Sequence, residues 1–241
     1  MLSHRTRRRL VRSVRFPITF VLAGVRGIEY RRHFSYAETY CQFIGYPRSG
    51  HTLIGALLNA HPDVVIANEL GVLDWMRKGF SRLQLFAMIL RRDRDFERQD
   101  YTFIGYQYAV PNQWQGRFRR IRVLGDKDAG RDTTQLRQRP ELLDRLRRKL
   151  RLKIRVVHVV RNPYDALSTF VIRRKELGDD TTLDTALGMA VEALETVDRV
   201  IWPLGPGRSS YNSARGLHLR SPERTLQPLP LCWRGVGPKL S

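Results

Sequence analysis

Residues 41–52 read CQFIGYPRSGHT, and this stretch decides the fold class of the chain. Cys41–Ile44 is a short apolar run typical of a buried strand, and residues 50–60 are apolar almost all round, as in a buried helix. The turn between them, Gly45–Thr52, therefore predicts a strand-to-helix loop. In such a loop the backbone N–H groups and the helix N-terminus form a cradle for an anion.

Strand-like and helix-like segments alternate along the sequence around this loop. Short apolar or β-branched runs predict further strands at 64–66, 121–124 and 154–160. Apolar residues at helical spacing predict helices at 70–92, 142–150 and 183–201. This alternation predicts an α/β fold of three layers, in which a mainly parallel sheet is flanked by helices.

The two ends differ from this central region, and we divide the chain into a leader (1–37), an α/β domain (38–202) and a tail (203–241). Residues 1–32 hold nine Arg and one Glu around a short apolar run. They predict a poorly ordered leader or a peripheral helix, with a basic amphipathic membrane anchor as an alternative. The tail holds six of the twelve prolines and five glycines, which predicts disorder.

The composition excludes several classes of protein. A chain of 241 residues with 42% hydrophobic residues is not wholly disordered, and no run of 18 apolar residues predicts a membrane span. Two cysteines exclude a disulfide framework and a four-cysteine zinc site, and no His-Glu-x-x-His pattern or metal-spaced acidic pair predicts a metal. The net charge of +20 indicates a polyanionic partner, or solvated basic ends without one.

The spacing of Gly45–Thr52 matches the nucleotide-binding P-loop, Gly-x-x-x-x-Gly-Lys-[Ser/Thr], with one difference. His51 stands where the lysine reaches the β- and γ-phosphates, which argues against an ATP or GTP site. Arg48 instead places a cation inside the loop. A glycine-rich turn without a ligand is the alternative interpretation.

The stretch Phe43–Asp63, FIGYPRSGHTLIGALLNAHPD, resembles the 5′-phosphosulfate loop of sulfotransferases. The usual form there is Pro-[Arg/Lys]-Ser-Gly-Thr-Thr-Leu, with His-Pro some ten residues later. His51 replaces the first Thr of that form, and Thr52 is retained. The resemblance implies that the 5′ end of 3′-phosphoadenosine 5′-phosphosulfate is bound by Pro47, Arg48, Ser49, Gly50, His51 and Thr52.

A second stretch, VHVVRNPYDALST at 157–169, resembles the 3′-phosphate motif of the same family. Arg161 stands at the expected strand end, where a guanidinium can bind a phosphate with two hydrogen bonds. The family's hydroxyl lies eight residues after this Arg, which is Thr169 here, with Ser168 as its neighbour. A surface Arg161 paired with Asp165 is the alternative.

Two further residues follow from the resemblance. Gly-Asp-Lys at 125–127 ends an expected strand, so that Lys127 and Arg48 stabilise charge on the transferring group. Glu69 follows the strand at 64–66 and stands 21 residues after Arg48, where some members carry the general base. An N-cap carboxylate for the following helix is the alternative for Glu69. His158 is expected in the core.

The resemblance implies a P-loop NTPase-like sulfotransferase fold, and we expect it to be incomplete at the C-terminus. It implies sulfuryl transfer from 3′-phosphoadenosine 5′-phosphosulfate to a hydroxyl or amine of a small-molecule, glycan or lipid acceptor, without metal. Acceptor specificity is expected in loops at 71–118. The alternatives are a P-loop nucleotide kinase or NTPase, a truncated inactive binding protein, and a basic module for nucleic acid or anionic membrane. We expect no specific nucleic-acid partner and a cytoplasmic protein, whose basic N-terminus is compatible with peripheral membrane contact.

Overall fold

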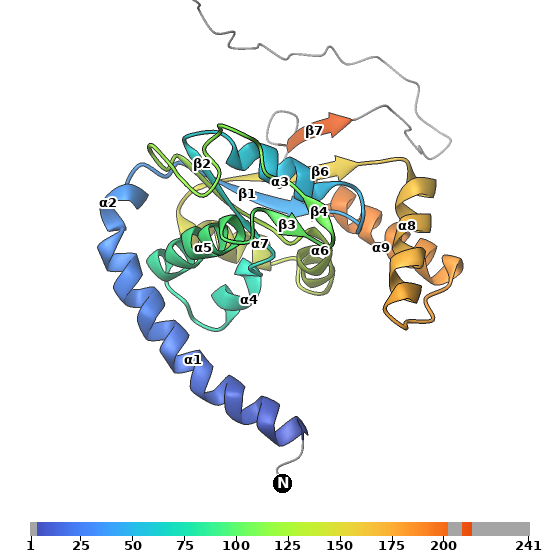
Figure 1. Cartoon of the computed structure of the whole chain (residues 1–241), viewed down its shortest axis with the longest axis horizontal. Helices are drawn as coiled ribbons and strands as arrows, with labels where there is room; N and C mark the ends of the chain where they lie inside the picture. The colour runs from blue at the N-terminus through green and yellow to red at the C-terminus, as the bar shows by residue number, and fades with distance from the viewer. Residues whose placement is uncertain (1–3, 202–208, 214–241) are drawn as a thin grey trace, which may run out of the picture.

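A parallel sheet forms the centre of the molecule (Figure 1). The computed structural model describes residues 4–201 and 209–213 of the chain, with side chains from Phe16 to Ile201. The sheet has the strand order β2-β5-β1-β6-β7, and all neighbours run parallel. Its strands are β1 (Thr39–Ile44), β2 (Val64–Asn68), β5 (Val123–Lys127), β6 (Lys153–Val160) and β7 (Ser209–Ser213).

Helices cover both faces of the sheet, so the prediction of an α/β fold with a parallel sheet flanked by helices is confirmed. The helix α3 (His51–Asn59) lies on one face, where Phe43 and Ile66 pack against it. The larger core lies on the other face. The helices around it are α4 (Val72–Arg77), α5 (Arg82–Glu97), α6 (Ala129–Gln138) and α7 (Leu142–Leu150).

Alternation along β1 explains why the two faces differ. Tyr40 and Ile44 are fully buried and belong to the larger core, while Phe43 points to the α3 side. The β-branched run in β6 is buried in the same way, with Ile154 and Val156 in the larger core. Residues of one strand that differ by two therefore share a face, as the pleat of a strand requires.

Two predicted boundaries were wrong for identifiable reasons. The expected helix at 70–92 is divided into α4 and α5, because Gly79 adopts a φ of 93° and Ser81 begins a new helix. Ser81 and Gln84 form a capping box there. The expected strand at 121–124 instead runs from Val123 to Lys127, so it includes charged residues that an apolar pattern does not detect.

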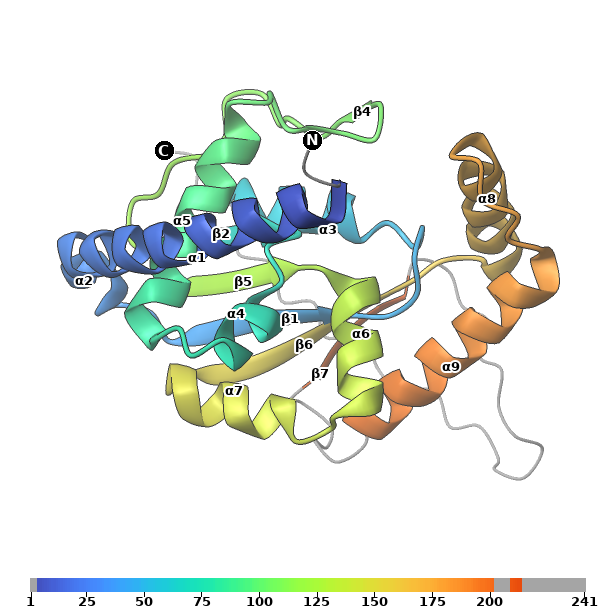
Figure 2. The same cartoon turned by 90° about the horizontal axis from the view of Figure 1, so that it is seen from below.

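Two helices and a hairpin extend from the sheet edge. The helices α8 (Pro163–Glu176) and α9 (Leu183–Ile201) pair beside the end of β6 (Figure 1, Figure 2). A short hairpin is formed by β3 (Thr102–Phe103) and β4 (Tyr106–Gln107). The sequence pattern predicted α9 but gave no signal for this hairpin.

The leader forms the helix α1 (His4–Glu29), followed by the short α2 (Arg31–Phe34). The helix α1 packs against α5, which it crosses in the view of Figure 2. Gly27 sits so close to α5 that an added Cβ would lie 2.9 Å from the backbone carbon of Leu83. The rings of Phe16 and Phe20 also contact Phe80. Within the described residues, the leader is therefore helical and packs on α5.

The tail contributes the strand β7, which its composition did not predict. Residues 209–213 pair with β6 in parallel, from Val156↔Ser209 to Val160↔Ser213. The other residues of the expected disordered tail lie outside the described residues.

Candidate functional site

The phosphate loop, residues 45–52, connects β1 to α3 through three residues with positive φ. Gly45 has a φ of 134°, and an added Cβ would lie 2.7 Å from Nδ1 of His158. Gly50, at φ 99°, precedes the first residue of α3, and Arg48 has a φ of 64°. Glycine is therefore required at position 45 by both conformation and space.

The backbone N–H groups of this loop are available to a ligand. Within the described part of the chain, no hydrogen bond is formed by the N–H groups of Ser49, Gly50, His51 and Thr52. These groups lie at the N-terminus of α3, where a helix attracts an anion. The predicted anion cradle therefore has the donors that it needs.

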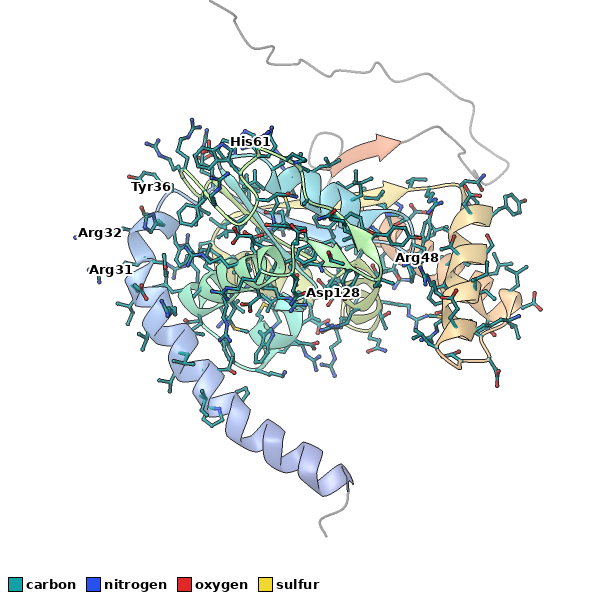
Figure 3. The ribbon with its side chains drawn as sticks, in the orientation of Figure 1. Arg31, Arg32, Tyr36, Arg48, His61 and Asp128 are labelled. Carbon is teal, nitrogen blue, oxygen red and sulfur yellow. The ribbon has the colours of Figure 1, made fainter. Side chains whose placement is uncertain are left out.

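The predicted site residues share one edge of the sheet. Glu69 follows β2, Lys127 ends β5, the loop follows β1 and Arg161 follows β6, so all four lie at carboxyl ends of neighbouring parallel strands. Figure 3 shows Arg48 and Asp128 toward this end, while Arg31, Arg32 and Tyr36 lie at the opposite end of the molecule. Ligands of parallel α/β sheets bind outside this edge.

Tyr46 joins the two segments that carry the resemblance. Its hydroxyl donates to the backbone oxygen of Arg161 at 2.8 Å and accepts from the backbone nitrogen of Arg161 at 3.2 Å. The guanidinium of Arg161 donates to the backbone oxygen of Arg48 at 3.3 Å. No ion pair links Arg161 to Asp165 in the described residues, so the alternative surface pairing is not found. Sequence reasoning missed Tyr46, because no motif marks its position.

The side chains of Ser49 and His51 support the loop from within. Nε2 of His51 lies 3.0 Å from the backbone oxygen of Ile44, which can only accept, so Nε2 carries the proton. Nδ1 then accepts from the hydroxyl of Ser49 at 2.7 Å. Burial lowers the pKa of His51 to about 3, so the imidazole is neutral. Both ring nitrogens of His51 therefore have partners within the protein, and its backbone N–H is the group that remains for the cradle.

The side chains of Pro47, within the loop, and Thr52, at its end, are both half-buried. Thr52 lines a small crevice between α3 and the strand ends, together with Lys127 and Asn68. This arrangement places a hydroxyl of the first turn of α3 near the buried ammonium. Thr52 therefore remains a candidate for a phosphate contact.

The pair of Lys127 and Glu69 forms the charged centre of this edge. Nζ of Lys127 lies 3.0 Å from Oε1 of Glu69, and the backbone nitrogen of Glu69 donates to the backbone oxygen of Lys127 at 2.9 Å. The Lys127 side chain is 5% exposed and that of Glu69 37% exposed. Burial lowers the pKa of Lys127, and the carboxylate of Glu69 opposes this shift. Because α4 begins after Gly71 without a side-chain cap, Glu69 is not its N-cap residue.

Asp126, which sequence reasoning missed, fixes the turn after Glu69. Its two carboxylate oxygens accept the backbone N–H groups of Leu70 at 3.0 Å, Gly71 at 2.7 Å and Val72 at 2.9 Å. Burial raises the pKa of Asp126, while these three donors lower it. A charged residue inside a buried strand is the signal that could have identified it.

Two more carboxyl groups lie behind this turn. Burial, and then the charge of Asp126, raise the pKa of Asp128 to about 7, and the same causes raise that of Asp132 well above its usual value. Asp132 accepts one hydrogen bond, from Gln42 at 2.6 Å, and its other oxygen has no partner. Within the described residues, no group of His, Cys, Asp or Glu is arranged to hold a metal ion. The raised pKa favours the neutral form of Asp132.

Ser168 and Thr169 are not brought into contact with Arg161 in the described structure. The hydroxyl of Ser168 donates to the backbone oxygen of Tyr164 at 2.5 Å, and that of Thr169 to the backbone oxygen of Asp165 at 2.6 Å. Both bonds lie within α8, so the two hydroxyls bind the backbone of their own helix. Either side chain must rotate before it can bind a phosphate.

The hairpin of β3 and β4 lies next to the charged centre. The ammonium of Lys127 lies 4.8 Å from the ring centre of Phe103, and the guanidinium of Arg173 on α8 lies 6.0 Å from that of Tyr106. Tyr108 follows the hairpin, and the charge of Arg48 opposes the rise that burial causes in its pKa. Phe103 of the hairpin therefore contacts the end of β5, and Tyr106 contacts α8.

A buried network holds α3 in place behind the loop. The side-chain oxygen of Asn59 accepts from the backbone nitrogen of Ile66 at 2.6 Å, and its amide donates to Asp93 at 2.5 Å. The hydroxyl of Tyr101 also donates to Asp93, at 2.8 Å. Despite these two donors, burial raises the pKa of Asp93 to about 7. The folded chain therefore favours the neutral form of this carboxyl.

Asp93 should make the folded state less stable as the pH rises. A carboxyl whose pKa is raised on folding binds its proton more tightly in the folded chain, so stability is lost between the ordinary pKa, about 4, and the folded value, about 7. Asp93→Asn removes this loss and keeps an oxygen for both donors. Its free energy of unfolding relative to the wild type should increase by roughly 1–4 kcal/mol from pH 4 to pH 8. Urea unfolding at several pH values measures this difference, and a difference independent of pH would refute the assignment.

Comparison with known proteins adds no family to these observations: no protein-family model and no curated protein matches the chain.

Proposed function

We propose that the chain is a sulfotransferase of the P-loop type that uses 3′-phosphoadenosine 5′-phosphosulfate as donor. The observation that carries the proposal is the meeting of two separate motifs at one sheet edge. The phosphate loop presents unpaired N–H groups, and Arg161 is tied to the same loop through Tyr46 and the backbone of Arg48. One ligand with phosphate groups at both its 5′ and 3′ positions fits such an arrangement.

In the proposed complex, the loop N–H groups and Thr52 bind the 5′-phosphosulfate, and Arg161 binds the 3′-phosphate. Arg48 and Lys127 stabilise the negative charge that moves from the transferring group to the leaving phosphate. Ser168 or Thr169 joins the 3′-phosphate after rotation of its side chain.

The proposed reaction forms one S–O or S–N bond to the acceptor and breaks the S–O bond to the donor phosphate. The acceptor oxygen or nitrogen attacks the sulfur, its proton passes to Glu69, and the bond from sulfur to the bridging phosphate oxygen breaks. The products are the sulfated acceptor and adenosine 3′,5′-bisphosphate. Glu69 is partly exposed and adjoins Lys127, which is the position that a base beside the transferring group requires. The hairpin residues 103–108 adjoin the same centre and are proposed to contact the acceptor.

A nucleotide kinase or NTPase is less well supported by the same geometry. The P-loop lysine contacts the β- and γ-phosphates through its charge, whereas His51 is neutral, 6% exposed and bonded on both nitrogens within the protein. We therefore keep this function as an outcome of the test below.

Nucleotide affinity tests the proposal. Adenosine 3′,5′-bisphosphate should bind at least about 10-fold more tightly than adenosine 5′-monophosphate, because a guanidinium–phosphate pair contributes about 1.5–3 kcal/mol. Arg161→Ala should remove most of this preference and leave affinity for the monophosphate nearly unchanged. Isothermal calorimetry measures both values.

The control is Arg148→Ala, which removes an exposed arginine from α7 and should leave both affinities unchanged. Equal binding of the two nucleotides by the wild type would refute the donor assignment. Tighter binding of ATP than of the bisphosphate would favour the kinase or NTPase class.

A further inference from the structure

The helix α1 has apolar side chains on the surface that faces away from the protein. Five of them, which we call the α1 stripe, are Ile18, Val21, Leu22, Val25 and Ile28, each 47–62% exposed. The opposite surface of α1 packs on α5, where Ala23 and Gly27 are buried. Residues 16–28 are therefore apolar on both sides of the helix, although only one side has a partner within the described residues.

The spacing of the α1 stripe makes it a continuous surface. Positions 18, 21, 25 and 28 follow one side of a helix, and Leu22 lies beside them, where it also lines the groove between α1, α4 and α5. Isolated exposed apolar residues are ordinary, whereas a contiguous exposed patch indicates an interaction surface. The stripe therefore requires an explanation that the sulfotransferase proposal does not supply.

Positive charge surrounds the stripe. The part of α1 before residue 16 has six arginines in its sequence. Arg26, between Val25 and Ile28, pairs with Glu29 at 3.1 Å, and Arg31 and Arg32 follow the helix. A groove of about 1360 Å³ between α1, α4 and α5 adjoins the helix. Its lining includes the carboxylates of Asp74 and Asp95, and six cations. These cations are Arg26, Lys78, Arg91, Arg92, Arg94 and Arg98.

This combination of charge and apolar surface selects among the partners that could cover the stripe. A second copy of the chain is disfavoured, because α1 is basic at both ends and would face like charges in either orientation. Nucleic acid would satisfy the arginines but leave the stripe in water. An anionic lipid surface satisfies both, since its headgroups attract arginine and its acyl region accepts apolar side chains.

The apolar part of α1 is too short to cross the bilayer. Residues 16–28 span about 20 Å at 1.5 Å per residue, against about 30 Å for the hydrocarbon core. No helix within the described residues has the length and hydropathy of a membrane span. We propose that α1 docks the chain peripherally on an anionic phospholipid membrane, with the α1 stripe at the acyl boundary and the surrounding arginines facing the headgroups.

Sedimentation with vesicles tests this docking and does not depend on any enzymatic activity. The full chain should bind vesicles of phosphatidylcholine with about 30% phosphatidylserine, and bind pure phosphatidylcholine at least about 10-fold more weakly, because each arginine near an anionic surface contributes about 1 kcal/mol. Salt should weaken the difference by screening.

Two double variants distinguish a specific effect of the α1 stripe on binding from a general effect of net charge. Val21→Glu with Val25→Glu places two carboxylates on the stripe, and Leu183→Glu with Leu187→Glu places two on α9, at the same spacing and similar exposure. Both variants lower the net charge equally. The stripe variant should lose about 10-fold or more of its affinity for anionic vesicles, and the α9 variant should bind nearly as the wild type does.

Several outcomes would overturn the proposal. It fails if both variants lose binding equally, or if the wild type does not bind anionic vesicles. It also fails if analytical ultracentrifugation shows a dimer that only the stripe variant abolishes, because a second copy then covers α1. Circular dichroism establishes that both variants are folded, and Val21→Ser with Val25→Ser replaces the stripe variant if it is not.

Discussion

Glu69→Gln should lower the turnover of sulfated product by roughly 10²-fold or more, with the affinity for adenosine 3′,5′-bisphosphate nearly unchanged. The reason is that glutamine keeps the shape of the side chain and an oxygen that can accept from Lys127, but it cannot take a proton. Glu69 lies 3.0 Å from Lys127, so it has two separable functions: proton acceptor and partner of a buried ammonium. The substitution removes the first and retains the hydrogen bond of the second.

The measurement is single-turnover sulfuryl transfer from the donor, with calorimetry for the product nucleotide. Glu97→Gln, at an exposed position near the end of α5, is the matched control and should keep wild-type turnover. If the only role of Glu69 is to hold Lys127 in place, Glu69→Gln should retain most of its turnover. Lys127→Met should then be the variant that loses turnover. Retained turnover in Glu69→Gln would therefore assign the base to another residue.

Asp126→Asn should destabilise the folded chain by about 2–5 kcal/mol, because hydrogen bonds to a charged acceptor contribute about 1.5–3 kcal/mol each. Asp126 accepts from the backbone N–H groups of Leu70, Gly71 and Val72 with both of its oxygens. Asparagine offers one oxygen, so its NH₂ group must face at least one of these donors. The turn after Glu69 loses its anchor, and activity should fall together with stability.

Asp132→Asn is the matched control for this prediction. Both residues are fully buried in the same cluster, but Asp132 accepts a single hydrogen bond and has an oxygen without a partner. If Asp132 is already neutral, an amide replaces a carboxylic acid and the change in unfolding free energy should stay within about 1 kcal/mol at pH 7. Equal losses in the two variants, measured by urea unfolding, would show that both carboxyl groups are ionised.

The first prediction tests the proposed reaction, and the second tests the contacts that stabilise the fold. The loss expected for Asp126→Asn follows from three hydrogen bonds of the structure and holds whatever the chain binds. The loss expected for Glu69→Gln follows from the proposed reaction. A destabilised Asp126→Asn together with a fully active Glu69→Gln would leave the fold account intact and remove only the base.

The local elements could be predicted from the sequence because local patterns encode them. The apolar run before Gly45 and the apolar segment after Gly50 predicted a strand, a loop and a helix, and β1 and α3 occupy those positions. The β-branched run at 154–160 and the helical spacing at 183–201 correspond to β6 and α9 in the same way. Each pattern is a repeat of two or about 3.6 residues, which reports how the chain alternates between core and solvent.

Only the tertiary structure decided which side chains of the candidate site meet. Tyr46 and Arg161 are 115 residues apart in sequence, and Asp126 binds backbone groups 54–56 residues away. Such contacts depend on the order β2-β5-β1-β6, which places β5 between two strands that precede it in the chain. The folded loop also pairs both ring nitrogens of His51 with groups of the protein, the Ile44 oxygen and the Ser49 hydroxyl, which its position in the motif does not reveal. A periodic pattern in the sequence reports which residues are buried, and it therefore determined the helices and strands. Strand order depends on the packing of the whole sheet, so only the assembled sheet determined which side chains meet in the site.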